Sequence, residues 1–282
     1  MAWDTPGYEL PTTSLQPEGK LLQIVRHPRL GAPLALTQGA SNGTQQVTRR
    51  YVYDGHGRLC KTLEPETGAT VMGHDNANNV TWTAAGLDAT TFGSLTDCQH
   101  AAAYGAGRTV TRTYDARNRP ATLTFPDGRG NQSWTYTPDS LVASTTVANG
   151  TMGTEQVTTA YSYNSRRLLA GEAMNQHGWY TWSIGYDYTG AGQLSRMVYP
   201  TGLTVDYQPN ALGQPTQVTD TQGRTYASGV EYHPNGSIKR FTYGNGVVHT
   251  MQQNARQLPS RVTASGGVMD FSYNYDPNAN IT

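Results

Sequence analysis

The chain alternates apolar and polar residues over short stretches, which are separated by clusters of Gly, Pro, Asn and Asp. Residues 109–114 (Thr-Val-Thr-Arg-Thr-Tyr) and 230–232 (Val-Glu-Tyr) show the alternation clearly. A period of two places successive side chains on opposite faces of a β-strand. The pattern therefore predicts strands of about five to eight residues joined by tight turns.

One signature recurs along the chain: an aromatic-x-Tyr pair, a polar residue that is often Asp, two spacers, then Gly or a substitute, a polar residue and Leu. Its clearest copy is Tyr51-Val52-Tyr53-Asp54-Gly55-His56-Gly57-Arg58-Leu59. We place the Asp position of the signature at 54, 75, 115, 137, 164, 189, 208, 233, 253 and 276. Neighbouring positions are 19 to 27 residues apart, except for one interval of 40, which we interpret as two periods with an eroded copy around residues 95–98.

A second turn follows most signatures after 13 to 15 residues. It is clear at 64–68, 125–128 and 199–202 and looser at 221–223, 244–246 and 265–267. Asp or Asn at a turn start can accept hydrogen bonds from downstream amides, and Gly supplies a positive φ. Each period thus holds two turns and two strands. Stacking the hairpins edge to edge pairs their backbones and buries the tyrosines on their neighbours.

The predicted fold class is all-β: tandem hairpins that form one long, twisted, curving antiparallel sheet. Residues 45–282 form the repeat region, about ten units of 19 to 27 residues, and residues 1–44 form an irregular or β lead-in. We expect both ends to be cuts in a longer chain. The signature residues build turns and strands, and we assign them no chemistry. They are Tyr53, Asp54, Gly57, Gly68, Tyr114, Asp115, Gly128, Tyr163, Asn164, Tyr188, Gly192, Gly202, Tyr207, Gly213, Gly223, Tyr232, Gly236, Gly246, Tyr275 and Asp276.

Composition excludes several classes of protein. The chain has 282 residues with 20 basic and 20 acidic side chains, so it lacks the basic excess that a nucleic-acid binder uses to release counterions. No apolar run approaches the roughly 20 residues of a membrane span, and the first residues do not form a signal peptide. Charged residues make up 14% of the chain, which suits a thin sheet of turn residues and Tyr/Thr strands.

Candidate chemistry is sparse. Cys60 and Cys98 are either two buried thiols, the simpler interpretation, or a disulfide that closes the loop between them. Trp179, Tyr180 and Trp182 form the most aromatic stretch, which we interpret as sheet packing or, alternatively, as a platform that contacts a glycan or peptide. Arginines of the repeat, namely Arg58, Arg119 and Arg167, are expected to fix turns through their planar guanidinium groups.

We do not expect an enzyme. Nucleophile-elbow, zinc-protease and phosphate-loop motifs are missing, and we assign no cofactor and no metal. Glycoside hydrolysis would need two carboxylates about 5 to 10 Å apart. A curved sheet could bring Asp187 near Asp206, or Glu64 near Glu66, but most acidic residues belong to turns.

The tandem Tyr-Asp units resemble the YD repeats of the bacterial Rhs (rearrangement hot spot) family. The resemblance is carried best by residues 51–68, 114–128 and 275–282 and covers about residues 45–282. It implies a segment of a β-sheet shell that sequesters a C-terminal toxin, in a secreted or cell-surface polymorphic toxin. Its partners would be neighbouring Rhs repeats and the enclosed polypeptide. The alternative implied by the family is a cell-surface module that binds carbohydrate or another ligand.

The chain departs from the family pattern at its end. The family's repeats are followed by a core-associated segment with a self-cleaving aspartyl site and then by a variable toxin domain. Asp276-Pro277-Asn278-Ala279 only partly matches the motif of that site. About ten repeats are too few to close a shell, so we expect an open sheet.

Overall fold

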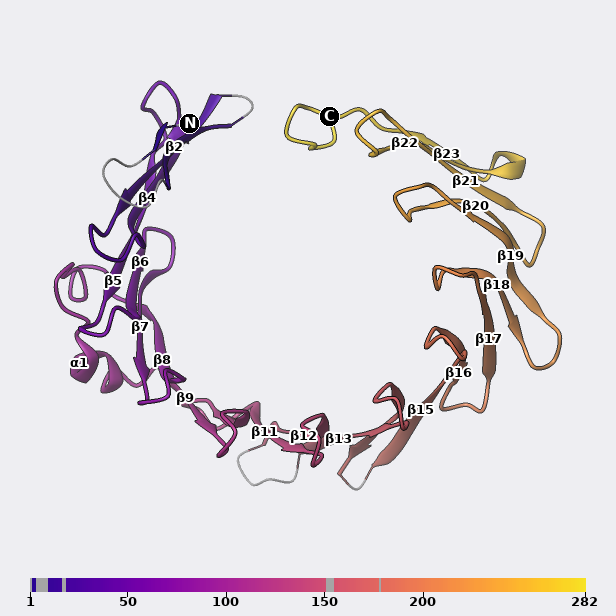
Figure 1. Ribbon diagram of the computed structural model, residues 1–282, viewed down its shortest axis with the longest axis horizontal. Helices are drawn as coiled ribbons and strands as arrows, with labels where there is room; N and C mark the ends of the chain where they lie inside the picture. The colour runs from indigo at the N-terminus through magenta and orange to yellow at the C-terminus, as the bar shows by residue number, and fades with distance from the viewer. Residues whose placement is uncertain (1, 4–9, 17–18, 151–154, 178) are drawn as a thin grey trace. The chain divides into compact units, whose positions relative to one another are not determined.

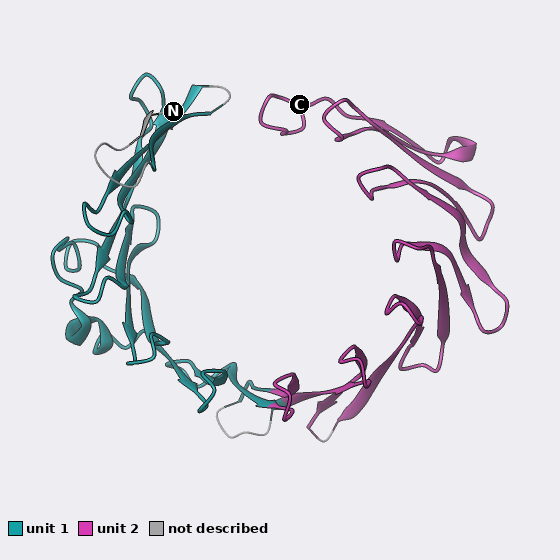
Figure 2. Cartoon of the chain, in the orientation of Figure 1, with its two compact units in different colours: residues 1–135, 146–156 teal, residues 136–145, 157–282 magenta. Residues whose placement is uncertain are grey.

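The computed structural model describes residues 2–3, 10–16, 19–150, 155–177 and 179–282. Within these ranges the chain is built from β-strands and turns, with one short helix, α1 (His100–Tyr104), and a 3-10 turn at Ser265–Gly267. The chain divides into two compact units (Figure 2): residues 1–135 with 146–156 form unit 1, and residues 136–145 with 157–282 form unit 2.

In unit 1, each strand pairs antiparallel with the next one along the chain, from β1 to β11. The strands of this unit are β1 (Ala2–Trp3), β2 (Pro11–Leu15), β3 (Lys20–Arg26), β4 (Pro33–Ala40), β5 (Val47–Tyr53), β6 (Leu59–Glu64), β7 (Gly68–His74), β8 (Val80–Leu87), β9 (Thr109–Tyr114), β10 (Pro120–Thr124) and β11 (Asn131–Tyr136) (Figure 1). Strand β12 (Val142–Ala148) has residues in both units.

Unit 2 repeats the same arrangement from β13 to β23. Its strands are β13 (Gln156–Tyr163), β14 (Leu169–Gln176), β15 (Tyr180–Tyr188), β16 (Leu194–Val198), β17 (Thr204–Pro209), β18 (Pro215–Asp220), β19 (Thr225–Tyr232), β20 (Ile238–Tyr243), β21 (Val248–Gln253), β22 (Pro259–Ala264) and β23 (Met269–Ser272). Pairing of consecutive strands through short turns confirms the predicted all-β, antiparallel fold class.

The sheet is thin, because few side chains are buried on either face. The buried hydrophobic residues of unit 2 are Val205 and Ala264, among the residues that the structure describes. Cross-strand polar pairs lie on the exposed faces, as at Thr113 and Thr122, whose hydroxyl oxygens are 2.6 Å apart. Such pairs each contribute a few tenths of a kcal/mol up to about 1 kcal/mol, so stability accumulates strand by strand.

Unit 1 contains the one thicker region in the described part of the chain. Residues 88–108, which we call the insertion, connect β8 to β9 and carry α1, which lies against β7 and β8 (Figure 1). The buried hydrophobic cluster joins the sheet to the insertion; its members are Ala69, Val71, Ala84, Leu87, Phe92 and Ala103.

The insertion corrects one sequence prediction. We expected an eroded hairpin within the interval of 40 residues, but β8 pairs directly with β9, with Trp82 opposite Thr111 and Ala84 opposite Thr109. The interval is therefore one period whose second turn has been replaced by 21 residues, numbered 88 to 108. Spacing alone cannot distinguish a degenerate repeat from a long connection.

Candidate functional site

The turns at the Asp position share one backbone pattern. In the first, Asp54 donates its N–H to the carbonyl of Arg58 (2.8 Å) and accepts from the N–H of Gly57 (2.9 Å). Gly57 has a φ of 76°, which a glycine adopts without strain. The same two bonds recur at positions 75, 115, 137, 164, 189, 210, 233, 254 and 276.

Two of these positions differ from the sequence prediction. The structure places the turns at Asn210 and Asn254, not at 208 and 253. At the first, Tyr207 suggested the tyrosine that precedes a turn, but Pro209 occupies that place. The corrected positions make the spacing in unit 2 more even, because 189, 210, 233, 254 and 276 follow one another at 21, 23, 21 and 22 residues.

The side chain at the Asp position closes its own turn. The Oδ1 atom of Asp54 accepts from the backbone N–H groups of His56 and Arg58, both at 2.9 Å, and its Oδ2 atom accepts from the Nε atom of Arg58 at 2.7 Å. Asp115 and Asn164 accept from the same two downstream amides. At Thr189, the hydroxyl oxygen accepts from the backbone N–H of Gln193, which is the second of these two amides.

Electrostatics agree with a structural role for these carboxylates. Burial opposes the ionisation of Asp54, but hydrogen bonds from the backbone and guanidinium of Arg58 and from the backbone of His56 outweigh it, and lower its pKa from 3.8 to about 2. Hydrogen bonds from the side chain and backbone of Arg119 lower the pKa of Asp115 to about 2. Carboxylates with such low pKa values stay ionised at neutral pH, so they anchor turns and do not donate protons.

Where a tyrosine precedes a turn, its hydroxyl can link that turn to the previous one. Tyr188 donates its hydroxyl to the carbonyl of Leu169 at 2.7 Å, five residues after the Asp position of the previous turn at Asn164. We call this contact the inter-turn tyrosine bond. It recurs from Tyr53 to Pro33, Tyr114 to Val80, Tyr163 to Val142, Tyr232 to Pro215 and Tyr275 to Pro259.

Tyr207 does not make this bond. It lies two residues earlier in its strand and donates to the Sδ atom of Met197 at 3.4 Å. Burial, together with a hydrogen bond involving Tyr199, raises its pKa to about 12. Its place in the repeat is that of Tyr51, the first aromatic residue of the signature.

The repeat arginines bond to turns, as the sequence suggested, and Arg58 and Arg167 also reach a neighbouring turn. The guanidinium of Arg58 also donates to the carbonyl of Asp75 at 2.8 Å, and that of Arg167 donates to the carbonyl of Asp139 at 2.9 Å. Arg119 pairs with Asp115 in its own turn. Arg166, which the sequence did not single out, reaches Thr189 and Gly190 in the next turn.

The second set of turns contains the predicted glycines. Gly68, Gly128, Gly202, Gly223 and Gly246 all have positive φ. Sequence reasoning missed Asp220, which is 5% exposed and accepts from the amides of Gln222 and Arg224, both at 2.9 Å. Asp-x-x-Gly-Arg at 220–224 has the same spacing as at 54–58, which was the available signal.

Cys60 and Cys98 form a disulfide, so the alternative of two buried thiols is wrong. The bond ties β6 to the insertion across a sequence separation of 38 residues. In the chain-entropy model, a loop of this length contributes about 4 kcal/mol. His100 lies beside the two sulfurs, as the one group of three potential metal ligands found in the described residues. Because the sulfurs are bonded to each other, only the imidazole would be available to an ion.

Lys61 is a second feature that the sequence did not indicate. It is fully buried, and its ammonium donates to the carbonyl of Asp97 (2.6 Å) and to the Oε1 atom of Gln99 (2.8 Å). Burial lowers the pKa of Lys61, while the charge of Asp97 opposes this shift. The β5–β6 register changes beside Cys60, because Val52 pairs with Lys61 and Tyr53 with Leu59. This bulge lets the consecutive residues Cys60 and Lys61 both contact the insertion.

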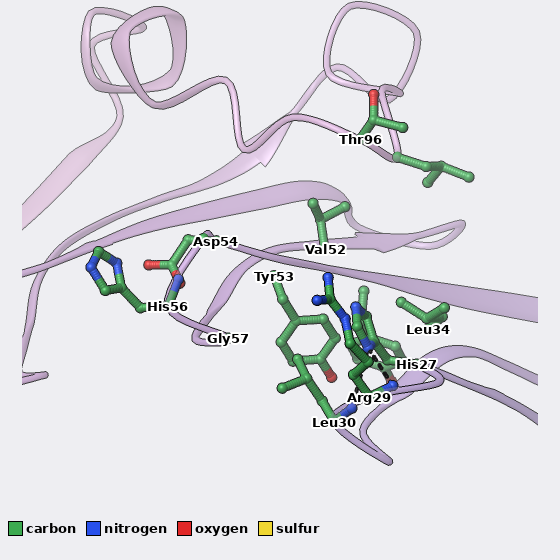
Figure 3. A pocket seen from close by; sticks show the side chains of 13 residues that line it. His27, Arg29, Leu30, Leu34, Val52, Tyr53, Asp54, His56, Gly57 and Thr96 are labelled. Carbon is green, nitrogen blue, oxygen red and sulfur yellow. Dashed lines mark hydrogen bonds between the residues drawn. The ribbon is translucent and has the colours of Figure 1, made fainter.

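A cavity of about 510 Å³ lies beside the first turn of the repeat region (Figure 3). Three of the polar groups in its lining already have hydrogen-bond partners. The Nδ1 atom of His27 accepts from the amides of Arg29 and Leu30, and the Tyr53 hydroxyl and the Asp54 carboxylate make the bonds described above. These three groups therefore take part in turn construction.

The aromatic stretch of unit 2 is exposed. Tyr180 and Trp182 stack with ring centroids 5.0 Å apart and are 41% and 50% exposed, while Trp179, in the preceding turn, is 81% exposed. Trp182 also lines an apolar cavity of about 350 Å³ with Tyr199, Pro200, Thr201 and Leu203. The structure thus brings two of the three predicted platform residues into direct contact.

The acidic pairs considered for glycoside hydrolysis are engaged in ion pairs or turns. Arg196, opposite Asp187 and Asp206 in the adjacent strands, donates to Asp206 at 2.6 Å. Glu66 pairs with Arg49, and Glu64 accepts from Thr67. Arg196 thus lies between Asp187 and Asp206 in the ladder, where a hydrolase would bind its sugar.

These features define a class of protein: tandem β-hairpins in which many turns are closed by their own side chain and several are bonded to a neighbouring turn. The family model for the RHS repeat matches residues 188–225, which begin with Tyr188 and include the turns at Thr189, Asn210 and Asp220. Together with the fold, this match confirms the predicted resemblance to the YD repeats of the Rhs family.

Solved structures of toxin complexes share the fold. The chain superposes on TcdB2-TccC3 with a TM-score of 0.63 at 14% identity, and on TcdB2-TccC3-Cdc42 with a TM-score of 0.64 at 13% identity. The Tc holotoxin pore of Photorhabdus luminescens gives a TM-score of 0.62 at 14% identity. Each match covers 93% of this chain and 15% of the other, so the chain spans a small part of those proteins.

No curated protein matches the chain by sequence. In the described part of the chain, no helix has the length and apolar character needed to cross a membrane.

Proposed function

We propose that this chain is a non-catalytic scaffold, part of an Rhs-type shell that encloses a toxin polypeptide. The observation that carries the proposal is the shared fold with the toxin-complex structures across 93% of the chain. Within the shell, residues 45–282 would act as the repeat region of about ten units and residues 1–44 as the lead-in.

The contacts of the repeat suit such a scaffold. The turn carboxylates, the tyrosine hydroxyls and the linking arginines are used to hold hairpins side by side, as at Asp54, Tyr188 and Arg58. A wall of this kind acts by geometry: it separates a volume from solvent and presents a surface to an enclosed chain. The partners would be neighbouring repeats and the enclosed polypeptide, in a secreted or surface-exposed bacterial toxin.

Protease protection tests this function. The gene product that carries residues 1–282 is purified from its source and digested under native conditions and after partial denaturation. We expect a polypeptide segment outside the repeats to resist digestion until the repeats are unfolded, with matching density inside the shell by cryo-electron microscopy. A gene product whose non-repeat segments are all digested under native conditions would contradict encapsulation.

A second candidate is glycan binding by unit 2. It is favoured by the exposed stack of Tyr180 and Trp182 beside the cavity of Pro200 and Leu203, since aromatic faces with adjacent polar tips suit sugar rings. A glycan array of the wild-type chain should then show binding that Trp182→Ala abolishes. Leu212→Ala, at an 82% exposed position in a turn, is the control that should retain binding. An array without saccharide binding would remove this candidate and leave the scaffold proposal intact.

A further inference from the structure

The insertion is an addition to a strand ladder that is complete without it. β8 and β9 pair with each other directly, as any two consecutive strands of the repeat do. Residues 88–108 could therefore leave the sheet surface without breaking a strand pair. What they cover is the face that carries Ala69, Val71 and Ala84.

The noncovalent contacts of the insertion include an unfavourable one. Phe92 and Ala103 bury apolar surface against Ala69, Val71, Ala84 and Leu87, with Leu63 and Trp82 beside them, and so favour the closed state. The closed insertion also buries the Lys61 ammonium, which keeps two acceptors there in place of full hydration. Opening would return this cation to water, so desolvation of Lys61 favours the open state.

The disulfide offsets this tendency. Cys60 lies in the sheet and is fully buried, and Cys98 lies on the insertion. An external thiolate that attacks either sulfur makes the other sulfur the leaving group. A dithiol reductant completes the exchange: its two thiols lose two electrons and two protons and form a disulfide, and Cys60 and Cys98 each become a thiol.

We propose that the Cys60–Cys98 disulfide is a redox-sensitive switch that holds the insertion on β6–β8, and that reduction releases the insertion while the strand ladder stays intact. Disulfides persist in oxidising surroundings and are reduced in a cytosol. The insertion would then be closed outside cells and open after entry into a reducing compartment. The inference rests on unit 1 alone and does not depend on whether the chain encloses a toxin.

The repeat itself supplies a conservative replacement for Cys60. The Cys60 Sγ atom lies 3.3 Å from the carbonyl of Val52, and equivalent positions carry Thr81 and Thr216, whose hydroxyls donate to the carbonyls of Gly73 and Gln208. Cys60→Thr should therefore preserve the bulge while removing the sulfur. The double variant Cys60→Thr/Cys98→Ser is the permanently reduced form.

Amine labelling of the full chain tests the switch. The sequence has three lysines, Lys20, Lys61 and Lys239. Lys61 is inaccessible in the closed state, and Lys239, with a side chain that is 51% exposed, is an internal reference. Because the chain has two cysteines, a dithiol reductant acts on this one bond. We expect reduction to accelerate labelling of Lys61 at least tenfold and to leave labelling of Lys239 unchanged.

Hydrogen–deuterium exchange completes the test. On reduction, amides of residues 88–108 should exchange at least tenfold faster, and those of β16–β22 should keep their rates. The double variant should show both changes without reductant and should not respond to it. Unchanged labelling of Lys61 and unchanged exchange of the insertion in the reduced wild type would overturn the switch. Loss of protection in both units would also overturn it, since the bond would then be a general stabiliser.

Discussion

The sheet of β6–β8 and the sheet of β16–β22 are built from the same hairpins but are stabilised differently. The first is covered by the insertion and has a buried cluster, a disulfide and a buried lysine. The second is bare on both faces and depends on turn bonds, inter-turn tyrosine bonds and cross-strand ion pairs such as Arg196–Asp206. Its buried residues, Val205, Asp220 and Ala264, are isolated.

The difference shows that the repeat does not need a core. In β16–β22 most backbone groups are paired within the ladder, and each turn satisfies its own amides, so the repeat can continue from one hairpin to the next. The core of unit 1 was added to such a sheet by lengthening one turn. Mutations in the two regions should therefore lower the free energy of unfolding by different amounts.

The largest effect is expected in the covered region. Phe92→Ala removes an aromatic side chain that is 7% exposed and should lower the free energy of unfolding of unit 1 by about 3 kcal/mol. Val205→Ala, the control in unit 2, should cost about 1 to 2 kcal/mol. Hydrogen exchange in increasing urea, followed separately in the two units, measures both. Equal losses for the two variants would contradict the distinction between covered and bare sheet.

Loss of a turn carboxylate should come next. Asp54→Ala removes three hydrogen bonds to a carboxylate that is 11% exposed, and should cost about 2 kcal/mol at pH 7. Because the folded pKa of about 2 lies below the ordinary 3.8, this stabilisation is present above about pH 4 and disappears as pH falls through about 2.

Urea denaturation of wild type and Asp54→Ala from pH 7 to pH 2 measures that dependence. The two curves should converge at the acidic end. Asp54→Asn is the control, because Asn164 makes the same two amide bonds in its own turn, and it should lose about half as much. A difference between wild type and Asp54→Ala that does not change with pH would show that the carboxylate charge plays no part.

The inter-turn tyrosine bond should contribute less. Tyr188→Phe removes the hydroxyl that donates to Leu169 and should cost about 1 kcal/mol in thermal or urea unfolding. Tyr207→Phe, which loses contacts to the Met197 thioether and to Tyr199 but no bond between turns, should cost less. Equal losses of stability in the two variants would show that the hydroxyl bond between turns does not contribute to the stability of the repeat.

The smallest expected effect is an increase in stability. His74 occupies the tyrosine position before the turn at Asp75, and its Nδ1 atom is buried without a hydrogen-bond partner among the residues that the structure describes. His74→Tyr would place a hydroxyl toward the carbonyl of Leu59, the equivalent of Leu169, and should stabilise unit 1 by about 0.5 to 1 kcal/mol. His74→Phe separates the hydroxyl from the ring, and a gain in that variant as large as in His74→Tyr would count against the bond.

Local chemistry made much of this protein predictable. Alternation and turn residues predicted the strands around Tyr53 and Tyr188, because each hairpin depends on residues close in sequence. The turn positions were predicted less accurately where Pro209 and Gln253 stand in place of the tyrosine. Backbone hydrogen bonds, and not the type of side chain, determine where each turn lies. Alternation alone placed Tyr180 and Trp182 on the same face of their strand, where their rings stack.

The sequence by itself determined the hairpin, its period and its family resemblance, because the Asp, Gly and Tyr of each unit act within one or two turns of the chain. Tertiary structure alone decided what covers the sheet. Whether Cys60 meets Cys98, and which acceptors Lys61 finds, depend on how a 21-residue connection folds back over β6–β8. That choice is made by contacts between residues 36 to 38 positions apart, for which neither period nor composition carries a signal.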